Sequence, residues 1–206
     1  MPPKGSYDAI IVGSGPNGLA AAITLAEAGL RTLIVEGDET VGGGTRSAEL
    51  TLPGFTHDVC SSILPLTAAS PFFRTFPFQK YDVEFITPPA AFAHLLDDQP
   101  AVLLEGDVAQ TARNLGLDDG AYQRLMDGLV SKLDQILEEF LGPFPFPPRY
   151  PLPFLQFSVK ALWPATLLAR NVFRGERARA LLAGFSAHSI QPLEWIATSS
   201  FALATG

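Results

Sequence analysis

The chain has 206 residues, of which 47% are hydrophobic and 17% are charged, and its formal net charge is −7. This apolar content is ample for a core and argues against intrinsic disorder, while the acidic balance argues against nucleic acid as a partner. A single cysteine, Cys60, excludes internal disulfides, a cysteine-based zinc site and a redox-active C-x-x-C pair. We therefore expect no metal, and we expect the Cys60 thiol to be buried and inert.

A short apolar run, AIIV at positions 9–12, is typical of a parallel strand that is buried on both faces. It leads into a G-x-G-x-x-G motif made by Gly13, Gly15 and Gly18, with Ser14, Pro16 and Asn17 between them. In such a motif the glycines permit a tight turn, backbone approach to a pyrophosphate and close packing of a helix. Pro16 suits the first turn of that helix, which we expect to end near residue 28, before Gly29.

A second strand is predicted at 32–35 (TLIV), and Glu36 stands at its end. Glu36 lies 36 − 13 = 23 positions after Gly13, close to the roughly 20 expected for the acid that accepts ribose hydroxyl protons. The first helical amides would face a diphosphate. Because a carboxylate repels a 2′-phosphate, Glu36 disfavours NADP and leaves FAD or NAD as the dinucleotide.

A second glycine pair, Gly42 and Gly43, follows in the stretch VGGGTRS at positions 41–47. Together with GSGPNGLAAA (13–22), Glu36 and PGFTHDVCSSILPL (53–66), this stretch resembles the phytoene dehydrogenase-like members of the FAD-dependent phytoene desaturase and amine oxidase superfamily. The resemblance implies that FAD is the cofactor, that the second glycine pair lies along it, and that a nearby arginine approaches its phosphate or ring. Related members place the arginine directly after the pair, whereas two residues intervene here before Arg46.

Residues 48–80 are predicted to leave the cofactor unit as a loop that contains the adjacent titratable residues His57 and Asp58. The resemblance would place this loop near a flavin, so either residue could face a substrate cavity. An Asx-type turn beside a solvated histidine explains the pair equally simply, and we favour it.

Alternating residues at 81–86, apolar runs at 91–96 and 101–104 and a turn at 97–100 predict an antiparallel hairpin or meander over about 81–105. His94 lies in this segment, where it either lines a cavity or is a hydrogen-bonded sheet residue. The resemblance places a substrate-domain sheet at this point of the chain.

Helices are predicted over about 107–141, where Asp107 caps a short helix and Asp118 opens a long amphipathic one. Six prolines at 142–153 predict an extended connection, and further helices are predicted over 154–206. Lys160, Pro164 and Arg170 interrupt the apolar run at 154–173, so it is unsuited to span a bilayer. The apolar run is followed by Arg174, Arg177 and Arg179. Residues 154–179 as a whole therefore form either a peripheral membrane contact or a helical lid with a basic face.

These elements predict an α/β protein (α+β overall): a Rossmann-like FAD-binding βαβ unit in residues 1–66 and the start of a mixed antiparallel-sheet and helical substrate domain in residues 67–206. No signal-peptide core precedes the first strand, so we expect a cytoplasmic protein. After residue 35 we find no further strand–helix–strand unit, although a doubly wound domain needs more than two parallel strands. We therefore expect an N-terminal fragment, or a truncated gene product, that by itself binds FAD weakly or not at all.

The expected function is that of an FAD-dependent oxidoreductase, desaturase- or dehydrogenase-like, with an apolar small molecule as substrate. Two alternatives stay open: an NAD-dependent dehydrogenase, and a catalytically silent protein that keeps the fold and binds a membrane or a partner. The sequence assigns no catalytic residue and gives no indication of oligomeric state.

Overall fold

The computed structural model describes residues 6–67, 69–143 and 145–205, and the chain divides into two compact units between Pro65 and Leu66. We call these the first unit and the second unit. Residues 1–5, Ala68 of the predicted loop and Phe144 of the predicted proline-rich connection lie outside the described residues.

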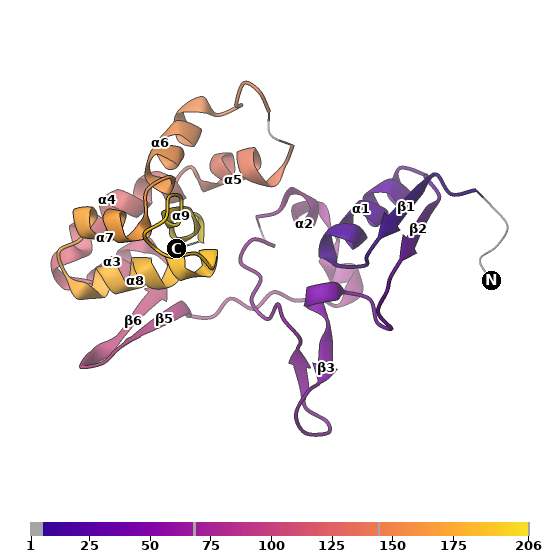
Figure 1. Ribbon diagram of the computed structural model, residues 1–206, viewed down its shortest axis with the longest axis horizontal. Helices are drawn as coiled ribbons and strands as arrows, with labels where there is room; N and C mark the ends of the chain where they lie inside the picture. The colour runs from indigo at the N-terminus through magenta and orange to yellow at the C-terminus, as the bar shows by residue number, and fades with distance from the viewer. Residues whose placement is uncertain (1–5, 68, 144, 206) are drawn as a thin grey trace. The chain divides into compact units, whose positions relative to one another are not determined.

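The first unit begins with a strand, a helix and a second strand: β1 (Ala9–Val12), α1 (Pro16–Glu27) and β2 (Thr32–Val35) (Figure 1). The two strands pair in parallel, with Ala9 opposite Thr32 and Val12 opposite Val35. The helix stops because Gly29 adopts a φ of +83°, a conformation that glycine reaches without steric cost. The predicted βαβ unit is therefore confirmed at its predicted boundaries.

The expectation that these strands are buried on both faces is wrong. Side chains alternate across a strand, and in β1 the half-buried Ala9 and Ile11 alternate with Ile10 and Val12, which are 62% and 86% exposed. Among the described residues β1 pairs only with β2. A run of apolar residues therefore does not by itself show that both faces are covered.

A small antiparallel hairpin follows, formed by β3 (Ser47–Glu49) and β4 (Thr56–Asp58), where the sequence predicted a loop. The hydroxyl of Ser47 donates to Asp58 over 2.8 Å, and Nε2 of His57 lies 2.8 Å from the hydroxyl of Thr51. His57 and Asp58 thus make hydrogen bonds within the hairpin and are not in the predicted Asx-type turn. Three-residue strands are too short for an alternation pattern to reveal them.

The second unit starts with a helix, α2 (Pro71–Thr75), and a 3₁₀ turn at Phe78–Tyr81, after which residues 82–88 have no regular secondary structure. The strand predicted at 81–86 is therefore absent. Aromatic rings pack here instead: Phe76 stacks on Tyr81 with centroids 5.5 Å apart, and Phe78 meets Phe85 edge-on at 4.9 Å. These ring contacts determine the local structure more strongly than the alternating pattern does.

The predicted hairpin is present as β5 (Ala90–Leu96) and β6 (Gln99–Glu105), which pair in antiparallel fashion. His94 lies opposite Val102 in this sheet. Its ring packs so closely on a later helix that a Cβ added at Gly184 would approach its Nδ1 to 2.5 Å. Gly184 therefore provides the space that His94 occupies.

Helix α3 (Val108–Arg113) is capped as predicted, because the Asp107 carboxylate accepts the amide of Gln110 over 2.7 Å. The long helix predicted after Asp118 is instead two helices, α4 (Asp119–Val130) and α5 (Leu133–Leu141). The chain turns at Ser131 and Lys132, and the Lys132 ammonium donates to Gln156 over 2.7 Å. Apolar spacing continues across this bend, so the sequence pattern did not reveal it.

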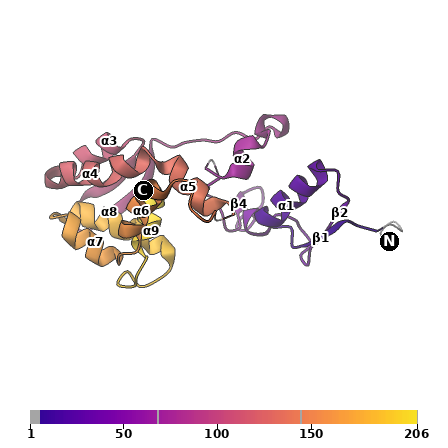
Figure 2. The ribbon, with the colours of Figure 1, turned by 90° about the horizontal axis from the view of Figure 1, so that it is seen from above.

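Four further helices complete the second unit: α6 (Pro151–Ala161), α7 (Ala165–Val172), α8 (Glu176–Ser186) and α9 (Ser199–Thr205). Helix α6 begins three residues before the predicted position, because Pro151 is well suited to its first turn. These helices share an apolar core to which Val102 and Leu104 of β6 also contribute. Figures 1 and 2 show the helices grouped together in the second unit. The most buried members of the core include Val102, Met126, Ile136, Phe173, Leu181 and Leu203.

A buried carboxylate ties two segments of this core together. Asp118 is almost fully buried and accepts the backbone amides of Arg174 and Gly175 over 2.9 and 2.6 Å. These amides stand at the start of α8, where backbone donors lack helical partners. A side chain 57 positions away in sequence thus caps this helix.

Candidate dinucleotide-binding site

The first glycine turn is shaped by contacts that only glycine allows. Gly13 has a φ of +93°, and a Cβ added at Gly18 would lie 2.2 Å from the Gly13 carbonyl oxygen. Helix α1 then starts with Gly15 at its N-cap and the exposed Pro16 and Asn17 in its first turn. No side chain caps α1, so among the described residues its first amides are available to an anion.

The second glycine pair packs directly on the first turn. The amide of Gly42 donates to the carbonyl of Ser14 over 2.9 Å, and Gly42 has a φ of +113°. A Cβ added at Gly43, whose φ is +54°, would lie 2.9 Å from the Cα of Gly15. The two loops are therefore in backbone-to-backbone contact, and together they border the start of α1.

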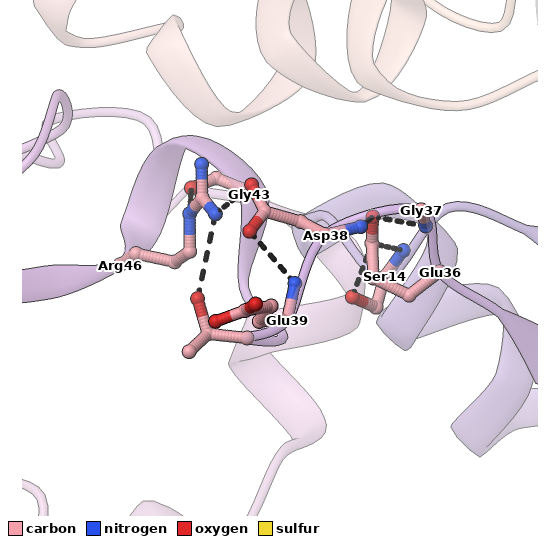
Figure 3. Close-up of polar contacts among 8 residues, drawn as sticks. Ser14, Glu36, Gly37, Asp38, Glu39, Gly43 and Arg46 are labelled. Atoms are coloured by element: carbon pink, nitrogen blue, oxygen red, sulfur yellow. Dashed lines mark hydrogen bonds and ion pairs between the residues drawn. The ribbon is translucent and has the colours of Figure 1, made fainter.

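Glu36 lies beside these loops, and its carboxylate accepts four hydrogen bonds (Figure 3). The amide and hydroxyl of Ser14 donate to Oε2 over 2.7 and 2.5 Å, and the amides of Gly37 and Asp38 donate to Oε1 over 2.8 and 3.0 Å. These donors, the Ser14 hydroxyl first, hold the Glu36 pKa at about 2 instead of its usual 4.5.

The low pKa of Glu36 has a consequence for stability. A carboxyl whose pKa is lower in the folded state stabilises that state when ionised. The contribution of Glu36 is therefore complete above its usual pKa of 4.5 and is lost as the pH falls toward about 2. At neutral pH the group is a carboxylate, the form that accepts hydrogen bonds from ribose hydroxyls and repels a 2′-phosphate.

Arg46 is engaged within its own loop. Its Nε donates to the carbonyl of Gly43 over 2.9 Å, and its guanidinium forms an ion pair with Asp38. The Arg46 hydrogen bond is the main reason that the Asp38 pKa is lowered. Arg46 therefore stabilises the loop at positions 41–47, which we call the second glycine loop. Contact between Arg46 and a cofactor phosphate stays a prediction. Asp38 is not among the residues predicted from the sequence, although a carboxylate eight residues from an arginine in a glycine-rich loop is a usable signal.

Cys60 also borders this region, and the expectation that its thiol is buried is wrong, since the residue is exposed. A Cβ added at Gly44 would lie 3.9 Å from its Sγ. The amide of the following residue, Ser61, donates to the Gly44 carbonyl over 2.8 Å. The thiol therefore lies against the second glycine loop.

Two of the four clustered arginines predicted as a basic face have structural partners. Arg177 donates to three backbone carbonyls, those of Asn114, Pro100 and Ala101, over 3.0, 2.7 and 3.4 Å. Arg179 donates to the carbonyl of Phe173 over 2.9 Å. Arg170 and Arg174 are exposed. Among the residues that the structure describes, no helix is both long enough and apolar enough to cross a membrane.

The remaining histidine, His188, lies in the 3₁₀ turn Ala187–Ser189 that follows α8. Its Nδ1 lies 3.2 Å from the carbonyl oxygen of Phe185, and its ring stacks on Phe201 with centroids 5.8 Å apart. A histidine that donates to the last carbonyls of a helix acts as a C-terminal cap.

A parallel βαβ unit with a G-x-G-x-x-G turn and an acid at the end of its second strand has the architecture of Rossmann-like dinucleotide-binding domains. Residues 11–76 match the family model described as "NAD(P)-binding Rossmann-like domain". The named relatives are oxidoreductases. Pyridine nucleotide-disulfide oxidoreductase domain-containing protein 2 of Rattus norvegicus is 29% identical over 149 residues, which cover 66% of this chain and 25% of that protein.

A limonene dehydrogenase component of Castellaniella defragrans is 27% identical over 136 residues, which cover 66% of this chain and 24% of the relative. The chain thus spans about a quarter of the length of these curated relatives. Among solved structures, wild-type putrescine oxidase bound to putrescine has a similar fold, with a TM-score of 0.60 and 21% identity over 95% of this chain and 40% of that one. The family model and the named relatives together support a Rossmann-like, dinucleotide-binding oxidoreductase, and the likeness to putrescine oxidase concerns the fold.

Proposed function

We propose that the first unit holds the adenosine and pyrophosphate of FAD in an oxidoreductase of the desaturase or dehydrogenase kind. The observation that carries this proposal is the backbone contact between the two glycine loops, Gly43 against Gly15, beside the ionised carboxylate of Glu36. The resemblance of the second glycine pair to that of FAD-dependent enzymes favours FAD over NAD.

The residues present fit such a cofactor. The uncapped amides at the start of α1 would receive the pyrophosphate, and Glu36 would accept the ribose hydroxyl protons. Gly42 and Gly43 let the second glycine loop pack against its neighbours, because an added Cβ would meet Arg46 at Gly42 and the Gly15 backbone at Gly43. When bound, FAD supplies the ability to accept a hydride equivalent, while the protein binds and orients it.

The proposed substrate is an apolar small molecule. Its support is the relative named as a limonene dehydrogenase, since limonene is a hydrocarbon. Among the described residues of the first unit, the acidic and basic side chains that meet at the glycine loops are Asp38 and Arg46, and these two form an ion pair with each other. We therefore assign no catalytic residue.

The test is a comparison of FAD, NAD⁺, NADP⁺ and FMN by isothermal titration calorimetry. For this chain alone we expect weak affinities in the rank order FAD, NAD⁺, NADP⁺, with NADP⁺ at least about tenfold weaker than NAD⁺, or ~1.4 kcal/mol, because Glu36 repels a 2′-phosphate. FMN lacks the adenosine half and is expected not to bind. Tighter binding of NAD⁺ than of FAD would favour the dehydrogenase alternative, and FMN binding as well as FAD would contradict the proposed site.

A second candidate function, membrane contact, is favoured by the surface of α6. The helix and its C-cap Leu162 expose an apolar stripe at spacings of three and four residues: Leu152, Leu155, Val159 and Leu162. The exposed cations Arg170 and Arg174 follow on α7 and the turn after it. We propose that this surface contacts an anionic bilayer, which would bring the protein to an apolar substrate.

A further inference from the structure

We propose that Ser14 is a positioning residue that holds the Oε2 atom of Glu36, so that the Oε1 atom is the one that receives ribose hydroxyls. This inference rests on the proposed function, because it concerns how the same site recognises adenosine. Its evidence is the unequal environment of the two carboxylate oxygens.

Oε2 is on the protein side of the carboxylate. Both of its donors come from Ser14, the hydroxyl at 2.5 Å and the amide at 2.7 Å. Ser14 is fully buried, and its carbonyl accepts the amide of Gly42 over 2.9 Å. The residue is therefore fixed from two sides, by Glu36 and by the second glycine loop.

Oε1 is on the solvent side. Its donors are the amides of Gly37 and Asp38, which are exposed residues of the loop that follows β2 (Figure 3). Amides in such a loop can be hydrated when they lose a protein acceptor, whereas a buried hydroxyl without an acceptor is strongly disfavoured. The two oxygens thus differ in how easily their present partners can be replaced.

A carboxylate offers about four acceptor positions, and in Glu36 all four are filled. A ribose hydroxyl must therefore replace or share one of the existing donors. Because the Ser14 hydroxyl has no route to solvent, the exchange falls on Oε1, and Ser14 keeps the carboxylate in place while it occurs.

Two charged residues near this carboxylate, Asp38 and Glu39, come from the loop after β2 (Figure 3). Asp38 is paired with Arg46, and Glu39 is exposed. Strand β1 and the first turn of α1 bring no charged side chain. The hydroxyl of Ser14 is thus the neutral group whose removal should act most directly on the ionisation of Glu36.

The first experiment measures the Glu36 carboxyl pKa by ¹³C NMR in the ligand-free protein. In Ser14→Ala and Ser14→Gly, which both keep the amide and remove the hydroxyl, we expect the pKa to rise from about 2 toward 4.5. Ser14→Thr keeps a hydroxyl and is expected to restore the low value. Ser47→Ala removes another hydroxyl of the first unit, one bonded to Asp58, and should change nothing. An unchanged pKa in both hydroxyl-free variants would overturn the inference.

The second experiment compares ADP with 2′,3′-dideoxy-ADP, which lacks both ribose hydroxyls. We expect the unaltered protein to prefer ADP by tenfold or more, and Ser14→Ala to reduce this preference to near parity with little change in the binding of the dideoxy probe. A preference retained by Ser14→Ala would overturn the positioning role. If the unaltered protein bound neither probe, the proposed function and the ribose assignment would both fail, whereas the NMR result would still show whether Ser14 holds Glu36.

Discussion

At the scale of single residues, the geometry of the site depends on glycines, which have no Cβ and so allow close approach of backbone segments. Gly18 and Gly43 each lie where a Cβ would meet backbone, at 2.2 Å from the Gly13 oxygen and 2.9 Å from the Gly15 Cα respectively. Backbone atoms cannot move aside as the end of a flexible side chain can. These two glycines therefore set the separation between the first turn, helix α1 and the second glycine loop.

The Gly43→Ala variant tests this point. An alanine there must keep a φ of +54° and press on Gly15, so we expect a loss of about 1–2 kcal/mol in the stability of the first unit and a clear loss of ADP affinity. The matched control is Gly37→Ala in the neighbouring loop, where an added Cβ meets nothing within 4 Å. Calorimetric titration with ADP measures both variants, and equal affinities would show that the close approach is not needed.

At the scale of elements, the sequence predicted those whose signals are local. The strands β1 and β2 and helix α1 were found at their boundaries, because an apolar run, a glycine turn and Gly29 define them within a few residues. The bend between α4 and α5 was missed, because apolar spacing continues through Ser131 and Lys132. The strand predicted at 81–86 was wrong, because ring packing is a tertiary contact that alternation does not encode.

The candidate site also contains features that local sequence signals predict and features that depend on tertiary contacts. The glycines of the first turn and Glu36 were identified from their spacing, and Gly42 and Gly43 from the family resemblance. The structure brings the two glycine loops together. The bond from Ser14 to Glu36 joins residues 22 positions apart, so it follows from the strand pairing and from no local pattern. The cap that Asp118 provides to α8 was missed for the same reason.

The apolar stripe of α6 yields a prediction at this scale. Leu155 and Val159 are 58% and 55% exposed, so replacing both by serine removes apolar surface without opening the core. We expect at least a fivefold loss of binding to vesicles that contain anionic lipid, measured by pelleting. The control pair is Leu50→Ser and Leu52→Ser, which are equally exposed in the first unit. No binding by the unaltered protein, or equal loss in the control, would contradict membrane contact through α6.

At the scale of the whole molecule, the two units differ in the core that each contains. In the described part of the first unit, Ala22 is the one apolar residue that is buried, whereas the second unit holds a continuous core from Val102 to Leu203. Burial of apolar surface is the main source of folding free energy. The first unit should therefore depend more than the second on a bound ligand for its stability.

We accordingly expect two unfolding transitions on heating, with the first unit melting at the lower temperature. Both tryptophans, Trp163 and Trp195, belong to the second unit, so their fluorescence follows that unit alone. Hydrogen exchange at the amides of β1 and β2 reports the unfolding of the first unit. ADP should slow that exchange and leave the tryptophan transition unchanged, and a single transition seen by both probes would contradict this prediction.

The position of Cys60 has a practical consequence. It is the sole cysteine of the chain, it is exposed, and it lies against Gly44 of the second glycine loop. A thiol-reactive dye would therefore attach at one place, beside the glycine loop of the proposed cofactor site. With the two tryptophans confined to the other unit, such a labelled protein carries two spectrally separate reporters, and one sample can record ligand capture and folding independently.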